Sequence, residues 1–186
     1  NENEILLFFS PQSRGATKGI ISLIRQAEHS IDVSIFFLTH NKISKELVFA
    51  YERGVKVRII LDATAAKNGY SKHNYLRKHG IDVKVENWGG KMHMKAAVFD
   101  KKHVVVGSMN WTKAGEKKND ENTIIIKNSP KHANQLFFFF EEMWNSIPAR
   151  WLLEDPNPES KESGTSCYDL IDNDFDKIID SNEMEC

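Results

Sequence analysis

The sequence predicts a mixed α/β domain in which helices flank a mostly parallel central sheet, followed by a short acidic extension. Two observations predict this fold class. Short runs of β-branched and aromatic residues alternate with segments of helical periodicity, which favours a sheet covered by helices. The 186 residues, 40% of them hydrophobic and 27% charged, suffice for one folded domain and exclude a fibrous or disordered chain.

The first half of the chain contains the alternating elements. Four runs have the length and composition of buried strands, at 4–9, 31–37, 55–61 and 81–86. Between them, apolar residues at helical spacing predict helices over 17–29, 42–53 and 71–79. Gly54 and Gly80 follow the last two helices, and glycine is the residue that most readily ends a helix.

The second half begins with a predicted hairpin, in which strands over 93–99 and 104–108 are joined by a polar turn at 100–103. Another strand is expected over 122–127. Ser129 and Pro130 then supply an N-cap and a first-turn proline for a helix that extends to about residue 147. The phenylalanine block at 137–140 is too short to span a membrane, and we interpret it as core.

The chain is expected to divide into three segments. Residues 1–153 form the main domain. Residues 154–166 form an exposed linker, because 154–160 contain two prolines and no apolar residue. Residues 167–186 form an Asp-rich segment between Cys167 and Cys186, the two cysteines of the chain.

Charge is distributed unevenly along the chain. Residues 1–153 carry 23 Lys and Arg against 15 Asp and Glu, whereas residues 154–186 carry 2 against 11. A basic domain favours polyanionic partners, either nucleic acid or an anionic membrane surface. An ordinary solvated surface explains the composition equally well. No apolar run is long enough for a transmembrane helix, and the start at Asn1 suggests a trimmed or mature chain.

A set of polar residues at fixed spacing occupies the predicted hairpin. The pattern is His93-x-Lys95-x4-Asp100-x6-Gly107-Ser108-x-Asn110. Residues i and i+2 of a strand share a face, so His93 and Lys95 are expected to point into the same space. The returning strand can bring Ser108 and Asn110 beside them, which places an imidazole, a fixed cation and two neutral hydrogen-bonding groups together.

These groups suit the cleavage of a phosphodiester without a metal. An imidazole can attack phosphorus, while an ammonium and an amide stabilise the phosphate oxygens. A second imidazole, protonated, is needed to donate a proton to the leaving oxygen. The other histidines have no comparable neighbours in sequence, and the domain has no cysteine and no helical histidine pair typical of zinc sites. No catalytic cofactor is therefore expected.

The pattern resembles the HKD motif of the phospholipase D superfamily, over roughly residues 4–150, and Glu121 matches the acidic residue that orients the histidine in that family. The family combines two motifs in each active site, and its small single-motif members achieve this by forming homodimers. The resemblance therefore implies that one His93 is the nucleophile and its partner's copy the general acid. It also implies that Lys95 and Asn110 bind phosphate, with Ser108 in support, and that Asp100 belongs to the catalytic set as a structural or charge-positioning group.

Three functions are compatible with these sequence features. The first is a nuclease that hydrolyses DNA or RNA through a phosphohistidine. The second is a phospholipase D or cardiolipin hydrolase, and the third is a non-catalytic module that binds nucleic acid. The basic domain favours the first, but the sequence leaves open DNA, RNA or lipid, the strand and sequence preference, and the biological target.

The acidic tail resembles a calcium loop of the EF-hand type, or the short Asp-rich repeats of thrombospondin-like extracellular proteins. The oxygen ligands of the loop would come from Asp172, Asp174, Asp176, Ile178, Asp180 and Glu183. Lys177 stands where such loops usually have glycine, and a solvated acidic tail is the alternative. Paired Cys167 and Cys186 and bound calcium would both indicate a periplasmic or secreted protein.

Overall fold

A computed structural model describes residues 3–13, 15–88 and 91–157. The predicted calcium ligands and both cysteines lie outside the described residues and stay predictions. Among the residues that are described, no helix is long and apolar enough to cross a membrane.

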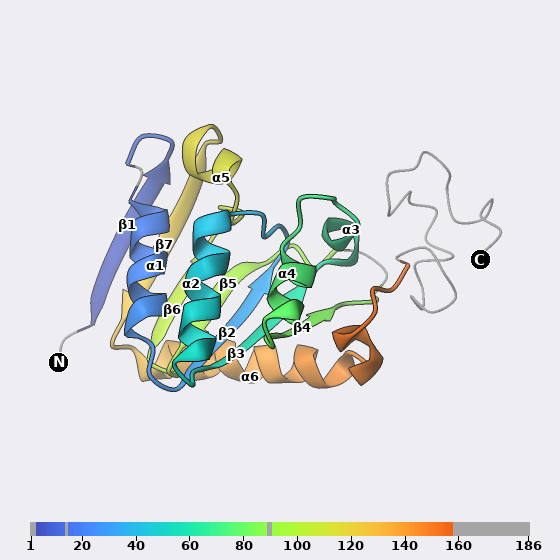
Figure 1. Ribbon diagram of the computed structural model, residues 1–186. Helices are drawn as coiled ribbons and strands as arrows, with labels where there is room; N and C mark the ends of the chain where they lie inside the picture. Colours follow the sequence, from blue (N-terminus) through green and yellow to red (C-terminus); the bar gives the residue numbers. More distant parts are fainter. Residues whose placement is uncertain (1–2, 14, 89–90, 158–186) are drawn as a thin grey trace.

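A seven-stranded sheet forms the centre of the described chain (Figure 1). Its order is β1-β7-β6-β5-β2-β3-β4. The strands are β1 (Glu4–Ser10), β2 (Ser30–Ile35), β3 (Lys56–Leu61), β4 (Asp82–Val85), β5 (Lys95–Phe99), β6 (His103–Gly107) and β7 (Glu121–Lys127). The pairings give β1, β2, β3, β4 and β6 one direction, and β5 and β7 the opposite direction.

Helices cover both faces of the sheet (Figure 1). They are α1 (Ala16–Gln26), α2 (Asn41–Glu52), α3 (Ala63–Ala66), α4 (His73–Lys78), α5 (Lys113–Lys117) and α6 (Pro130–Ser146), followed by the 3-10 helix η1 (Ala149–Leu152). Helices α1, α2 and α4 pack on one face through apolar residues such as Ile20, Leu47 and Leu76. Helix α6 lies on the other face, where Ala133 packs against Val98 and Val104.

The long elements confirm the sequence prediction, and the fold is the expected mixed α/β sheet with flanking helices. Gly54 follows α2 with a φ of +93°, as a glycine after a helix can. The sheet is less parallel than expected, however, because only the β2-β3 and β3-β4 pairs are parallel among its six neighbouring pairs. Strands β5 and β7 run opposite to the other five strands, and each lies between two of them. The four pairs that they form are therefore antiparallel.

The interpretation of residues 137–140 as core was wrong in part. Phe140 is buried beside Trp144, but Phe138 and Phe139 are 66% and 49% exposed. Consecutive helical residues are about 100° apart around the axis, so four in a row cannot all face one sheet. The exposed pair lies on the side of α6 that points away from the sheet.

The main domain extends beyond the expected boundary at residue 153. Asp155 accepts hydrogen bonds from His73 Nε2 at 2.8 Å and Arg77 Nη1 at 2.7 Å, and Pro156 is buried. The beginning of the expected linker, residues 154–157, is therefore attached to α4. Polar contacts of Asp155 hold this segment in place of apolar packing. The absence of apolar residues therefore did not indicate a free linker.

Candidate active site

The predicted site residues gather at one edge of the sheet. Strands β1, β2, β3, β4 and β6 end at this edge, and β5 and β7 begin there. His93 lies just before β5, Ser108 and Asn110 lie just after β6, and Glu121 begins β7. The edge formed by the carboxyl ends of strands is where open α/β sheets usually bind ligands.

His93 and Lys95 share one side of the chain, as the spacing predicted. The His93 ring lies 4.7 Å from the ring of Phe36, and Lys95 Nζ lies 5.1 Å from the same ring. Lys95 Nζ also donates a 2.6 Å hydrogen bond to the carbonyl oxygen of His93. Phe36 was not predicted as a site residue, yet its ring fixes the relative position of the imidazole and the ammonium.

The two residues differ in exposure. The Lys95 side chain is 6% exposed, whereas His93 is exposed to solvent. Burial lowers the pKa of Lys95, although the charges of Glu121 and Asp62 act in the opposite direction. A buried ammonium that faces two carboxylates remains a local positive charge that can act on a bound phosphate with little screening from water.

Burial also lowers the pKa of His93, and the neighbouring Lys95 charge lowers it further. The charges of Asp62 and Glu121 oppose this effect. Because the ordinary histidine pKa is already near neutrality, the lowered pKa favours the neutral imidazole at pH 7. A neutral imidazole is the form that can act as a nucleophile.

Ser108 and Glu121 form a fixed pair between the ends of β6 and β7. Ser108 Oγ donates to Glu121 Oε2 at 2.6 Å and accepts from the Asn122 backbone N–H at 3.0 Å. Asn119 Nδ2 donates to the other oxygen of Glu121 at 3.1 Å. The hydroxyl of Ser108 is therefore engaged in a supporting role, and Glu121 acts on His93 through its charge rather than through a hydrogen bond.

Gly107 permits this close packing. A Cβ atom at position 107 would collide with the backbone oxygen of Asn122 and lie 2.9 Å from Thr123 Cα. The Ser108 backbone N–H donates to that same Asn122 oxygen at 3.0 Å. The glycine of the motif is explained by this approach of two backbones, which places Ser108 next to Glu121.

Asn110 is oriented by the backbone of the neighbouring segment. Its Oδ1 atom accepts a hydrogen bond from the Phe37 backbone N–H at 3.2 Å. This bond fixes the amide so that its Nδ2 group is the end available to donate to a ligand.

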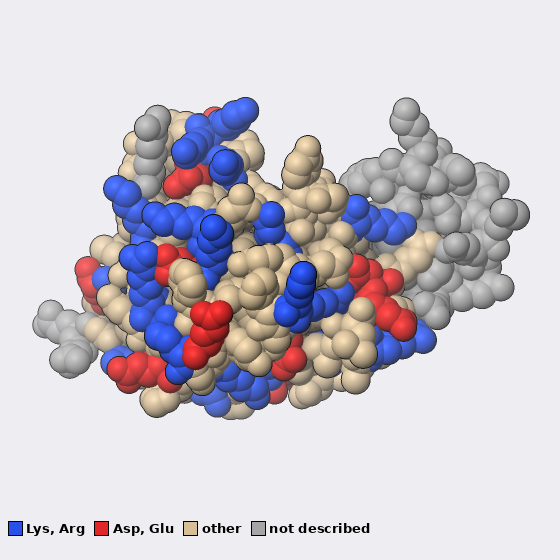
Figure 2. Space-filling model, in the orientation of Figure 1, with Lys and Arg blue, Asp and Glu red and all other residues tan. Residues whose placement is uncertain are grey.

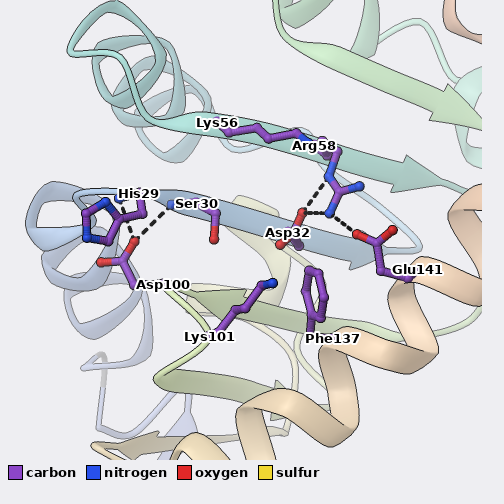
Figure 3. Close-up of a pocket in the computed structure, with 9 residues that line it drawn as sticks. All are labelled: His29, Ser30, Asp32, Lys56, Arg58, Asp100, Lys101, Phe137 and Glu141. Carbon is purple, nitrogen blue, oxygen red and sulfur yellow. Dashed lines mark hydrogen bonds and ion pairs between the residues drawn. The ribbon is translucent and has the colours of Figure 1, made fainter.

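Asp100 lies at the opposite edge of the sheet from His93. It follows the last residue of β5, which at about 3.3 Å per residue separates it from Lys95 by roughly 16 Å. Its carboxylate accepts hydrogen bonds from the backbone N–H groups of residues 28, 29 and 30, at 3.0, 2.8 and 2.9 Å. Figure 3 shows the bonds from His29 and Ser30. Burial raises the pKa of Asp100, but these three donors outweigh it and the net pKa is lowered.

Asp100 therefore lies in a structural position and does not join the other predicted catalytic residues. It borders a cavity of about 380 Å³ whose wall includes the buried ion pair of Arg58 with Asp32 (Figure 3). Glu141 of α6 binds the same guanidinium at 2.5 Å. This cavity belongs to the far edge of the sheet and is separate from the motif residues other than Asp100.

Sequence reasoning missed two acidic residues beside the motif. Asp62 follows β3 and Glu86 follows β4, so both lie at the same edge as His93, and they are 0% and 1% exposed. Each is the first charged residue after a buried strand, which is the signal that could have identified them. Among the described residues, no group of three or more His, Cys, Asp or Glu side chains forms a metal site.

Comparisons with known proteins agree with the motif. Residues 20–144 match the family described as "Cardiolipin synthase, PLD-like domain". A protein of Rickettsia conorii named "Phospholipase D" is 39% identical over 127 residues, which are 68% of this chain and 63% of that protein. The human "Mitochondrial cardiolipin hydrolase" is 28% identical over 158 residues, 84% of this chain and 61% of that protein. The chain thus spans about three fifths of the length of these relatives.

Solved structures agree as well. Nuc from Salmonella typhimurium, titled a phospholipase D family member, superimposes with a TM-score of 0.75 and 32% identity, covering 79% of this chain and 97% of that one. NucT from Helicobacter pylori gives a TM-score of 0.74 at 27% identity, over 78% and 98% of the two chains. Taken together with the grouped motif residues, these matches show that the chain belongs to the phospholipase D superfamily.

Proposed function

We propose that the protein is a phosphodiesterase that cleaves nucleic acid without a metal ion, as a homodimer with one composite active site. The observation that carries this proposal is the gathering of His93, Lys95, Asn110 and the Ser108–Glu121 pair at one sheet edge. Together they supply a nucleophile, a buried cation and an oriented amide donor, which is the set that phosphoryl transfer requires.

In the first step, the neutral imidazole of one His93 attacks phosphorus. A P–N bond forms and the P–O bond to the leaving group breaks. The imidazolium of the partner's His93 gives its proton to the leaving oxygen, which departs as an alcohol. Lys95 and the Nδ2 group of Asn110 stabilise the charge on the phosphate oxygens during this step.

In the second step, water attacks the phosphohistidine. The partner's His93, now neutral, takes a proton from the water as the new P–O bond forms and the P–N bond breaks. The product is a phosphate monoester, and both imidazoles return to their initial protonation states. Because one ring must be neutral and the other charged, activity should follow a bell-shaped pH profile that belongs to the coupled pair.

An uncovered apolar surface supports the homodimer. Ile5, Leu7 and Phe9 of β1 are 62%, 58% and 57% exposed. They lie opposite Ile126, Ile124 and Asn122 of β7, on the face of the sheet that α6 covers only in part. We call this surface the β1 face. It ends next to Ser10, which pairs with Glu121 of the site, so a second copy on this face would approach the active edge.

The charge around the site supports a nucleic acid substrate. Lys113, Lys117 and Lys118, in and directly after α5, are exposed just beyond Asn110. Figure 2 shows basic side chains over α5 and over the neighbouring beginnings of α1 and α2. A polyanionic strand gains affinity from such a border through the release of counterions.

The proposal can be tested with three substrates: single-stranded DNA, RNA and liposomes that contain cardiolipin or phosphatidylcholine. The wild type should cleave nucleic acid equally well with and without EDTA. His93→Ala should reduce turnover by at least about a thousandfold, because the nucleophile and the general acid are lost together. Activity that disappears with EDTA, or that survives in His93→Ala, would contradict the mechanism.

Lipid hydrolysis is the second candidate function, because curated relatives carry the names phospholipase D and mitochondrial cardiolipin hydrolase. The same chemistry applies to a phospholipid headgroup. Turnover of liposomes with inert DNA and RNA would reverse the order of the two candidates. Tight binding of nucleic acid without turnover at several pH values would instead indicate a binding module.

A further inference from the structure

Asp62 and Glu86 form a buried acid pair directly behind the segment that carries His93. They follow the neighbouring parallel strands β3 and β4 and are hydrogen-bonded to each other. Both side chains are almost fully excluded from water, at 0% and 1% exposed. Two carboxylates in this position cannot both ionise at low cost, so they are expected to share one proton.

The pair is tied to four backbone donors. Asp62 accepts from the N–H groups of Ala65 and Met92, both at 3.0 Å. Glu86 accepts from the N–H groups of Ala63 at 3.0 Å and Trp88 at 2.7 Å. Met92 is the residue before His93, and its own side chain is buried. The Asp62 carboxylate thus fixes the chain one residue away from the proposed nucleophile.

The shared proton resides on Glu86. Burial, together with the charge of Asp62 and the hydrogen bond to it, raises the pKa of Glu86 to about 8. Burial raises the pKa of Asp62 as well, but the backbone donors, the charge of Lys91 and the hydrogen bond to Glu86 oppose this rise. Asp62 therefore carries the negative charge of the pair. This charge acts to raise the pKa of His93 and of Lys95, and the charge of Lys91 acts to lower the pKa of Asp62.

We propose that Asp62 and Glu86 are positioning residues for the reaction: together they hold the Met92–Lys95 segment in place and keep one negative charge behind His93 and Lys95. This inference rests on the proposed function of His93. The charge of Asp62 favours the protonated form of a His93 imidazole and the ammonium of Lys95. Because Glu86 is neutral, the pair carries one negative charge, on Asp62. The protonated Glu86 donates a hydrogen bond to Asp62, whereas an ionised Glu86 would repel it.

The shared proton can be observed in the wild-type protein by a ¹³C NMR titration of its side-chain carboxyl groups. We expect one carboxyl of the pair to remain protonated through neutral pH and to lose its proton near pH 8. Glu86→Gln assigns that signal, since it should remove this titration and no other. Two carboxyls that are both ionised at neutral pH would overturn the inference, and this result needs no variant that might fail to fold.

The effect on His93 is tested with Asp62→Asn, with Asp82→Asn as a matched control. Asp82 is an exposed acid at the other end of β4. Asp62→Asn should move the NMR titration midpoint of His93 to lower pH and reduce kcat by about tenfold to a hundredfold, with a smaller change in KM. Glu86→Gln should keep the His93 midpoint at neutral pH, because Asp62 stays charged.

If Asp62→Asn leaves both the His93 midpoint and kcat at the wild-type values, the positioning role is wrong. The two proposals fail in different ways. A wild-type protein that cleaves no phosphodiester would refute the proposed function, whereas the two NMR titrations would still decide whether the pair shares a proton and acts on His93.

Discussion

Asp100 illustrates how a residue of a catalytic motif can serve the fold. Its carboxylate accepts three backbone N–H groups at the loop between α1 and β2, at the edge remote from His93. Its own φ of +53° is in the left-handed region, which asparagine also tolerates. Replacement by asparagine therefore changes the carboxylate without straining the backbone.

We expect Asp100→Asn to lower the free energy of unfolding by about 1–3 kcal/mol, because an amide has a single acceptor oxygen for three donors. Urea denaturation would measure this loss, and kcat should stay at the wild-type value. Since the pKa of Asp100 is lowered in the folded state, the difference between variant and wild type should be present at neutral pH and disappear as the pH falls below about 4. A large loss of kcat in a stable variant would assign Asp100 a role in the chemistry.

Glu86 should make the free energy of unfolding fall with rising pH, whereas Asp100 makes it rise. Its folded-state pKa of about 8 lies above the ordinary 4.5, so the folded protein binds more protons in that window. Its contribution to stability is therefore full below about pH 4.5, decreases as the pH rises toward 8, and then levels off. The free energy of unfolding of the wild type minus that of Glu86→Gln should follow this curve in urea denaturation. Parallel stability curves would show that Glu86 is ionised at neutral pH.

At this scale the sequence identifies residues whose role depends on spacing, such as His93, Lys95 and Asn110. It does not identify Asp62 and Glu86, because their pairing depends on β3 and β4 lying side by side, and they are 24 positions apart in the chain. Phe36 was missed for the same reason. Its contact with His93 exists only because the chain after β2 lies beside the chain before β5.

Strand β1 exposes apolar side chains that no part of the described chain covers. On the helix-covered side, Leu6 and Phe8 pack against the core, whereas Ile5, Leu7 and Phe9 on the other side are exposed. An edge strand with an apolar exposed face favours association with a second molecule.

We expect Leu7→Lys to weaken the proposed dimer by about tenfold to a hundredfold, because the new ammonium would lose its hydration in the proposed interface. Sedimentation should show more monomer, and specific activity should fall on dilution and recover at high protein concentration. Phe49→Lys is the control, since Phe49 is 53% exposed on α2, on the opposite face of the molecule. An active monomer of Leu7→Lys would contradict the composite site.

The elements that the sequence missed are short. Helices α3 and α5 have 4 and 5 residues, too few for a helical period to be recognised. Both begin with a side chain that caps the first turn: Asp62 accepts from Ala65 N, and Thr112 accepts from Gly115 N. Helices this short depend on tertiary contacts at the carboxyl edge of the sheet for their stability. Local sequence preference alone therefore could not predict them.

Charge is unevenly distributed over the whole chain, with a net positive domain and a net negative tail. The lysines around α5 lie close to the site, whereas Lys56 and Lys78 are exposed at the opposite edge of the sheet. If nucleic acid is the substrate, its affinity should depend on where the lysines lie as well as on the total charge of the domain.

We expect the double variant Lys117→Glu and Lys118→Glu to raise KM for single-stranded DNA and leave kcat nearly unchanged. Loss of two phosphate contacts should reduce the slope of log affinity against log salt by about 1.4. The double variant Lys56→Glu and Lys78→Glu makes the same change in net charge and should have a much smaller effect. Equal effects of the two variants would indicate that only the overall charge attracts the substrate.

The strand order has a practical consequence for handling the protein. Strand β1 lies at one margin of the sheet, and η1 packs beside β4 at the other margin. Attachment to a bead or an electrode through the carboxyl side of the domain would therefore leave β1 accessible to a freely added copy. An immobilised subunit with an intact His93 should gain surface-bound turnover when soluble subunits with an intact His93 are supplied, whereas soluble His93→Ala subunits should add none, because each subunit contributes one of the two imidazoles.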